Sequence, residues 1–135
     1  MAKSALELTP RIQRHLENDV VLWLATAGPG RPQAVPVWFW WDGSSFLIYS
    51  IPGQKVRDIE ANSLVQLHLN TDRGGDFVVR FDGEAEILKD HPLATRVRKY
   101  IDKYRDRIRA YGWTPKVFAE RYHIAIRIRP TRLRS

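Results

Sequence analysis

Apolar residues change their spacing several times along this sequence, and the changes mark successive strands and helices. Runs of strand length or strand-like alternation cover residues 20–26, 33–41, 45–50, 64–70, 77–88 and 123–130. Apolar residues at helical spacing predict helices over residues 9–18, 53–62, 93–111 and 115–122. Most of the six strands follow one another through short connections. A mainly β fold is therefore expected, a closed or partly closed β-barrel with α-helices packed outside it.

Local residues support several of these boundaries. Thr9 and Thr114, each followed by proline, are expected to cap the starts of two helices. Asp42-Gly43 lies between two strand-like runs and predicts a hairpin, because the turn needs a positive φ that glycine adopts at little cost. Gly83 interrupts the long run 77–88 and predicts a bulge or bend there.

The helix expected over residues 93–111 is amphipathic, with its basic residues mostly on the solvent side. Its apolar stripe is expected to be buried and consists of Leu93, Val97, Tyr100, Ile101, Tyr104, Ile108 and Tyr111. Gly112 ends the helix. In the strand that follows, Ile124, Ile126 and Ile128 are expected to point inward, and the alternating arginines outward.

Length and composition limit the protein to one small domain spanning residues 1–135. The 135 residues are 44% hydrophobic, which is enough for a modest core but leaves little room for a deep pocket built by one copy. Cysteine is absent, so disulfides and thiolate metal sites are excluded. No signal-peptide pattern and no apolar run of about 20 residues occurs. A cytoplasmic protein without a membrane partner is expected.

The net charge of +7 is concentrated in the C-terminal part of the chain. Residues 90–135 hold 13 basic and 4 acidic side chains, whereas residues 1–89 hold 9 and 11. Such asymmetry is typical of a nucleic-acid surface or of a field that attracts an anionic ligand, and an ordinary solvated helix would also produce it. Because the tyrosines of the basic helix belong to its apolar stripe, no aromatic face is left for stacking on bases. Nucleic acid is therefore not expected as a partner.

Lys55 is the first candidate for binding chemistry. It follows Gly53 and Gln54 at the start of an expected helix, where free backbone N–H groups and the helix dipole favour an anion. An ammonium group there adds a formal charge, so a cofactor phosphate is the ligand to test. Arg57 could supply a second cation, or it could face solvent.

The aromatic strand before this helix offers an apolar wall. Trp38 and Trp40 share one face of the expected strand, and Phe39 and Trp41 share the other. Most of these rings are expected to pack in the core. The segment Val35–Trp38, if it is exposed at an edge, would supply both an apolar surface and backbone groups that can bind a pyrimidine edge.

Other catalytic chemistries lack support in the sequence. The four histidines, His15, His68, His91 and His123, are scattered, so no metal site is expected. No serine lies in a nucleophile elbow, and no pair of acids is marked out for general acid–base work. Asp82, Glu84 and Glu86 alternate along one strand and are expected to meet solvent or arginines of a neighbouring strand. The sequence identifies no catalytic residue.

Several segments together resemble a known family. The segment VPVWFWWDGSSFLIYSIPGQKVRDIEANSLVQLHLN, the GGD loop and the closing IRIRPTRLR resemble the pyridoxamine 5′-phosphate oxidase-like, FMN-binding split-barrel family. The likeness extends over nearly the whole chain. Within that family, these segments are most similar to the branch of probable oxidoreductases that depend on the deazaflavin coenzyme F-420.

The resemblance implies a homodimer of six-stranded split β-barrels, with two cofactor sites between the subunits. Residues matching Val35, Pro36, Val37 and Trp38 line the flavin or deazaflavin ring in such proteins. Residues matching Tyr49 and Ser50 lie near the ribityl phosphate, and the residue matching Lys55 binds that phosphate. The expected cofactor-binding residues are therefore Val35, Pro36, Val37, Trp38, Tyr49, Ser50, Gln54, Lys55 and Arg57.

Two positions depart from the oxidase that gives the family its name. Gln54 stands where that enzyme has arginine, and Ala34 where it has another basic residue. Oxidation of pyridoxamine phosphate is therefore not expected. The resemblance implies instead hydride transfer between reduced coenzyme F-420, or alternatively FMN, and a small organic substrate. A non-catalytic carrier of a cofactor or tetrapyrrole such as heme, built on the same fold, is the alternative.

Overall fold

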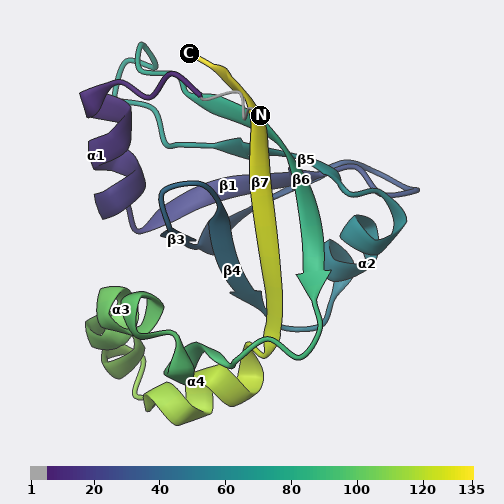
Figure 1. Cartoon of the computed structure of the whole chain (residues 1–135), viewed down its shortest axis with the longest axis vertical. Helices are drawn as coiled ribbons and strands as arrows, with labels where there is room; N and C mark the ends of the chain where they lie inside the picture. Colours follow the sequence, from purple (N-terminus) through teal and green to yellow (C-terminus); the bar gives the residue numbers. More distant parts are fainter. Residues whose placement is uncertain (1–5) are drawn as a thin grey trace.

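The fold is a curled antiparallel sheet with helices at its ends and sides (Figure 1). The computed structural model describes residues 6–135. Its strands are β1 (Val21–Thr26), β2 (Gln33–Trp38), β3 (Trp40–Trp41), β4 (Phe46–Ser50), β5 (Leu64–His68), β6 (Arg80–Leu88) and β7 (Ile124–Arg134). Its helices are α1 (Pro10–Asn18), α2 (Gln54–Ala61), the short 3-10 helix η1 (Ala94–Arg96), α3 (Arg98–Ala110) and α4 (Pro115–Arg121).

The strand order β2-β1-β5-β6-β7-β4-β3 closes the sheet into a split barrel. The outermost strands β2 and β3 are consecutive in sequence and separated only by Phe39. One stretch of chain therefore pairs with β1 through its first part and with β4 through its second. This arrangement confirms the mainly β, split-barrel fold expected from the sequence.

The strand count differs from the expected six, because the segment 33–41 is broken at Phe39. The Phe39 N–H donates to the Tyr104 hydroxyl at 2.8 Å, and the Phe39 carbonyl oxygen lies 2.9 Å from that hydroxyl. The Lys103 ammonium also donates to the Phe39 carbonyl, at 2.8 Å. These backbone groups are thus satisfied by α3 rather than by a neighbouring strand, and the sheet has seven strands.

Two hydrophobic clusters lie on opposite sides of the sheet. The larger fills the barrel and includes Phe39, Phe46 and Ile126. The smaller lies between the outer face of β4 and β7 and the helices η1, α3 and α4, and includes Leu47, Tyr100, Tyr104 and Phe118. The predicted alternation of side chains along 38–41 is confirmed. Phe39 and Trp41 belong to the larger cluster, whereas Trp38 and Trp40 belong to the smaller one.

The expected helix 93–111 is interrupted. Val97 separates η1 from α3, and its backbone has φ −106° and ψ 91°. Tyr100, Ile101, Tyr104 and Ile108 are buried as predicted. The prediction was wrong for Leu93, which precedes η1 and is 38% exposed, and for Tyr111, which is 69% exposed. Tyr111 caps the C-terminal end of α3, past the last turn that packs on the sheet.

Most local predictions are confirmed. The Thr9 and Thr114 side chains each accept a hydrogen bond from the first turn of the helix that follows, at 3.2 Å. Gly43 has φ +102° in the hairpin between β3 and β4, and the β6–β7 register shifts at Gly83. The largest differences in strand boundaries are at β6, which begins at Arg80 rather than residue 77, and at β7, which continues to Arg134 rather than ending near residue 130.

The acids of β6 meet arginines of β7 or solvent, as expected, and Glu84 is the one that faces solvent. Glu86 lies 3.5 Å from Arg129, and Asp82 lies 3.4 Å from Arg134. Both pairs are at least partly exposed, so each adds little to stability. Across residues 6–135, no helix combines the length and apolar character needed to cross a membrane.

Candidate functional site

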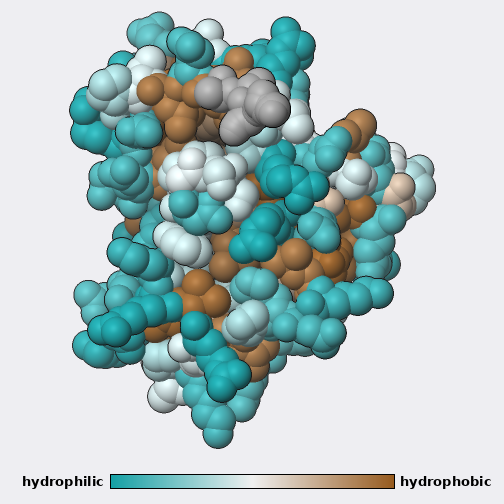
Figure 2. Space-filling view, viewed as in Figure 1, coloured by the Kyte–Doolittle hydropathy of each residue, from teal (hydrophilic) through white to brown (hydrophobic). Residues whose placement is uncertain are grey.

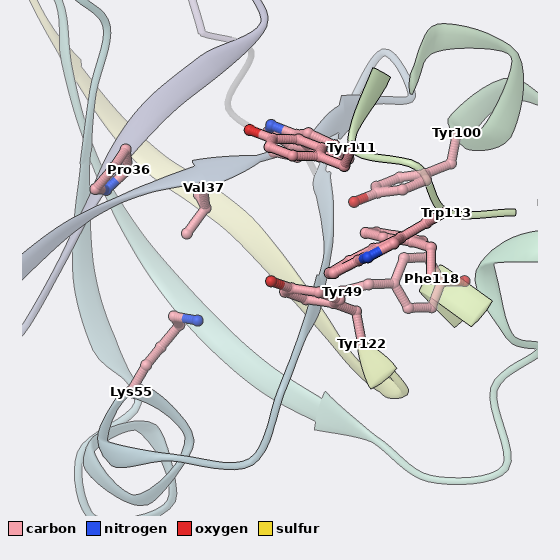
Figure 3. Close-up of a pocket in the computed structure, with 10 residues that line it drawn as sticks. Pro36, Val37, Tyr49, Lys55, Tyr100, Tyr111, Trp113, Phe118 and Tyr122 are labelled. Carbon is pink, nitrogen blue, oxygen red and sulfur yellow. The ribbon is translucent and has the colours of Figure 1, made fainter. Parts of the chain in front are cut away.

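A pocket of about 390 Å³ lies where the edge strand β2, helix α2 and helices α3 and α4 approach one another (Figure 3). Its lining residues come from segments far apart in the sequence. They are Pro36, Val37, Trp38, Tyr49, Lys55, Tyr100, Tyr111, Trp113, Phe118 and Tyr122. The volume lies at the small end of the range for ligand pockets.

Lys55 supplies the cation of this pocket, and Figure 3 shows its side chain rising from α2 into it. The Lys55 ammonium donates to the Ser50 hydroxyl at 2.7 Å. Burial lowers the pKa of Lys55, and no described carboxylate lies within 4.0 Å of its nitrogen. A half-buried ammonium with only a hydroxyl partner favours an anion that would offset its lost hydration.

The position of α2 is fixed by Asp58, whose side chain is 2% exposed. One carboxylate oxygen of Asp58 accepts from the Thr26 hydroxyl at 2.9 Å, and the other accepts from the Gln54 amide at 2.7 Å. These bonds connect the end of β1 to the first turn of the helix that carries Lys55. No side chain of the described residues caps the N-terminal end of α2, so the N–H groups of its first turn are available to a ligand.

The second wall of the pocket comes from β2, which forms one edge of the sheet. In Figure 3, Pro36 and Val37 lie on β2 above Lys55, and Val37 is the nearer of the two to the aromatic rings. Pairing with β1 occupies only one side of an edge strand, so backbone groups on the other side are available to a ligand. This wall therefore combines apolar side chains with unpaired polar backbone.

The remaining wall is aromatic. Trp38 stacks on Tyr104 with the ring centroids 4.5 Å apart and the planes 4° from parallel. Trp38 also stacks on Phe118 at 5.5 Å, and Phe118 stacks on Tyr122 at 4.9 Å. The outer rings are spaced more widely, with 6.1 Å between Tyr111 and Trp113. Closely stacked rings form the base of this wall, and more loosely spaced rings form its rim.

Of the nine expected cofactor residues, the structure brings Pro36, Val37, Trp38, Tyr49 and Lys55 to the pocket. Ser50 is 1% exposed and reaches the site through its hydrogen bond with Lys55. That these residues bind a cofactor stays a prediction.

The other three expected residues do not line the pocket. Val35 packs against the barrel core. Gln54 is exposed, and its amide group bonds Asp58 and Arg57. The exposed Arg57 guanidinium donates to the Gln54 side-chain oxygen at 3.1 Å and points along the helix surface. Nothing in the structure directs these three side chains into the pocket.

Half of the lining was not selected from the sequence. These residues lie on α3, on α4 or in the segment that follows each of these helices, and they are Tyr100, Tyr111, Trp113, Phe118 and Tyr122. These aromatic residues are visible in the sequence, but helical spacing assigned Tyr100 and Tyr111 to a buried stripe and gave the other three no role. Only the packing of α3 and α4 against β4 and β7 brings them opposite β2.

No described side chains are arranged as a metal site. In residues 6–135, no group of three His, Cys, Asp or Glu residues is close enough to hold an ion. His91 lies near the pocket, with its Nδ1 atom 3.3 Å from the Tyr49 hydroxyl.

The family model for pyridoxamine 5′-phosphate oxidase matches residues 8–135 of the sequence. The chain belongs to that family. Because the match includes every strand and helix described above, the whole split barrel is covered. No curated protein matches the sequence significantly.

Solved structures of the same fold carry several different functions. A candidate pyridoxamine 5′-phosphate oxidase from Listeria innocua is 22% identical, with a TM-score of 0.72, covering 95% of this chain and 97% of its own. An F-420 reductase is 26% identical, with a TM-score of 0.69, covering 90% and 94%. The heme storage protein HutZ of Vibrio cholerae is 17% identical, with a TM-score of 0.67, covering 96% and 94%.

Proposed function

We propose that this protein is a flavin- or deazaflavin-dependent oxidoreductase that transfers hydride between reduced coenzyme F-420, or FMN, and a small organic substrate. One observation carries the proposal: the half-buried Lys55 ammonium, whose one hydrogen bond within residues 6–135 is to Ser50 at 2.7 Å, lies in a pocket that is otherwise apolar and aromatic. A ligand that carries a phosphate next to a conjugated ring would match this pocket, because the phosphate suits the ammonium and the ring suits the apolar walls.

The residues present fit such a cofactor. Lys55 and the free N–H groups of α2 would bind the phosphate. The β2 edge would place Pro36 and Val37 against the ring and offer backbone groups to its polar edge. The aromatic rim would exclude water from the reacting atoms. The bound ring would supply the electron pair, so the protein's own tasks are to bind, orient and desolvate.

The choice between the two rings rests on the family branch and on charge. The F-420 reductase shares 26% identity with this chain over 90% of its length. Coenzyme F-420 carries an anionic tail, and the 13 basic residues of segment 90–135 would attract it. We therefore propose coenzyme F-420 as the preferred cofactor and FMN as the alternative, with the protein acting in the cytoplasm.

A homodimer is part of the proposal. Trp23, which is 40% exposed, and Pro36 lie opposite each other on the paired strands β1 and β2, and Leu64 on β5 is 61% exposed. Trp23 and Pro36 form an apolar patch on the outer sheet face, and this patch continues into the pocket wall at Pro36. On another side of the molecule, where β7 is nearest the reader, Figure 2 also shows hydrophobic surface between hydrophilic side chains. A second copy on the outer sheet face would complete a pocket that one chain leaves small.

Binding measurements on the purified protein test the proposal. FMN and coenzyme F-420 are titrated separately, in oxidised and reduced form, by calorimetry or fluorescence. Binding of at least one ring with a Kd well below millimolar is expected, corresponding to more than about 4 kcal/mol. If neither ring binds, the oxidoreductase proposal is wrong.

Turnover assays on the same preparation distinguish an enzyme from a non-catalytic carrier. A protein that binds a reduced ring tightly, but never oxidises it with any of a panel of quinone, nitro and enone acceptors, would be the non-catalytic carrier. The ten lining residues include no His, Met or Cys, so a heme iron in this pocket would need a lining tyrosine or the nearby His91 as its axial ligand. A heme titration with a sharp Soret shift at one equivalent would favour the tetrapyrrole alternative instead.

A further inference from the structure

Four tyrosines line the pocket, and their environments differ. The Tyr49 hydroxyl donates to the Pro92 carbonyl oxygen at 2.7 Å, and burial raises the pKa of Tyr49 to about 12. Tyr100 is fully buried, and burial raises its pKa well above the usual value. Tyr111 is 69% exposed at the end of α3. Two of the four are therefore poorly placed to give up a proton, and a third lies mostly in solvent.

Tyr122 differs from the other three. It caps the C-terminal end of α4, where its N–H donates to the Phe118 carbonyl oxygen at 2.8 Å. Its half-buried ring stacks on Phe118 with centroids 4.9 Å apart and planes 14° from parallel. Figure 3 shows the ring projecting from α4 into the pocket, toward the side on which Lys55 lies. Among the hydrogen bonds of residues 6–135, none involves the Tyr122 hydroxyl.

We propose that the Tyr122 hydroxyl is the proton donor for substrate reduction in this pocket. The inference rests on the proposed function and adds to it a catalytic residue. Tyr122 would give its proton to one atom of a polarised double bond as hydride from a reduced flavin or deazaflavin adds to the other. The π bond breaks, the substrate gains two electrons and two hydrogens, and the ring is oxidised. Solvent then returns the proton to the partly exposed phenolate.

The surroundings of Tyr122 suit this role. The stack on Phe118 fixes the plane of the ring, and Trp113 limits it on another side at 6.2 Å. A donor whose position is fixed before the substrate arrives loses little entropy when the substrate binds. Its hydroxyl has no described partner to give up, so donation to a substrate breaks no hydrogen bond within residues 6–135. The substrate class that fits is a conjugated carbonyl, quinone or imine compound, which needs both a hydride and a proton.

The test compares the wild-type protein with Tyr122→Phe, which keeps the ring stack and removes the hydroxyl. Affinity for the oxidised cofactor is measured first, and the variant is expected to match wild type within about twofold. The affinity of 4-nitrophenolate, an anionic mimic of the product oxygen, is then measured on the cofactor-loaded proteins. Loss of one hydrogen bond to a charged oxygen is expected to weaken it at least tenfold.

Single-turnover reduction of menadione provides the kinetic readout. The rate of hydride transfer is expected to fall by about 10²- to 10⁴-fold in Tyr122→Phe, which is the rate enhancement that a general acid usually provides. A role limited to packing would leave the rate of hydride transfer in Tyr122→Phe close to that of wild type.

Three outcomes overturn the inference. The first is a Tyr122→Phe protein that binds 4-nitrophenolate and transfers hydride within threefold of wild type. The second is a loss of the same size in Tyr111→Phe but not in Tyr122→Phe. The third is a wild-type protein that binds neither ring, which removes the proposed function and this inference together. Normal cofactor binding with unchanged hydride transfer in Tyr122→Phe would remove only the inference.

Discussion

The Tyr104 hydroxyl lies 2.8 Å from the backbone nitrogen of Phe39, at the point where one strand breaks into β2 and β3. The same hydroxyl lies 2.6 Å from the Val20 carbonyl oxygen. A helix residue thus joins the break in the barrel to the start of β1. Because the Tyr104 ring also stacks on Trp38, this contact supports the wall of the pocket.

The first prediction concerns Tyr104→Phe. The substitution leaves the buried Phe39 N–H without its partner, so the free energy of unfolding should fall by about 1 to 3 kcal/mol. Urea denaturation measures the change. Tyr111→Phe is the matched control, since its side chain is 69% exposed and should change stability by less than about 0.5 kcal/mol. Equal stability of the two variants would show that the Tyr104 bond contributes nothing net.

The second prediction concerns Lys55→Ala. Loss of the half-buried ammonium should weaken cofactor binding by about 1.5 to 3 kcal/mol, the range for a charge-assisted hydrogen bond to phosphate. Isothermal calorimetry on wild type and variant measures the difference. The control is Lys99→Ala, which removes the same charge from an exposed position of α3. An affinity unchanged by Lys55→Ala, or lowered equally by both variants, would place the phosphate elsewhere.

The third prediction concerns Gly28→Ala in the loop after β1. Gly28 has φ +52°, and an added Cβ would collide with the Asp58 carboxylate that bonds Thr26 and Gln54. The unfavourable backbone and the displaced carboxylate should together cost about 2 kcal/mol of stability. Gly30→Ala is the control, because its Cβ would meet no atom within 4 Å. Thermal unfolding compares the two variants, and equal melting temperatures would contradict the expectation.

Because Asp58 fixes the first turn of α2, Gly28→Ala should also lower cofactor affinity. A loss of stability with full affinity would show that α2 keeps its position without this carboxylate.

The fourth prediction concerns pH. Burial lowers the pKa of Lys103 to about 8, partly offset by Asp19. The unfolded chain, with a lysine pKa near 10.5, binds more protons than the folded protein between about pH 8 and 10.5. The Lys103 contribution therefore makes the free energy of unfolding rise with pH across that window. Below about pH 8 both states are protonated, and the contribution is constant.

Lys103→Met tests this sign. Denaturation curves are measured from pH 7 to 10.5, and the difference in stability between wild type and variant is followed. That difference should shift in favour of wild type as the pH rises through the window. A pH-independent difference would mean that the ammonium on the Phe39 carbonyl is not desolvated in the folded protein.

Much of the fold could be predicted from the sequence, because local chemistry determines it. Alternation along 124–128, the threonine caps and Gly43 each act through neighbouring backbone, and each was confirmed. Lys55 was recognised for the same reason, since the start of a helix is a local feature. Its partner Ser50 lies only five residues away.

The other half of the pocket was decided by tertiary structure. Tyr111 fits the apolar spacing of α3 as well as Tyr104 does, yet only Tyr104 lies over the sheet. Spacing records which face of a helix is apolar, but not where the supporting sheet ends. The break at Phe39 likewise depends on a hydroxyl 65 residues away. The sequence by itself determined the strands, the caps and the place of Lys55 at the start of α2, whereas long-range packing decided which aromatic rings face that lysine, because contacts between distant segments leave no local pattern.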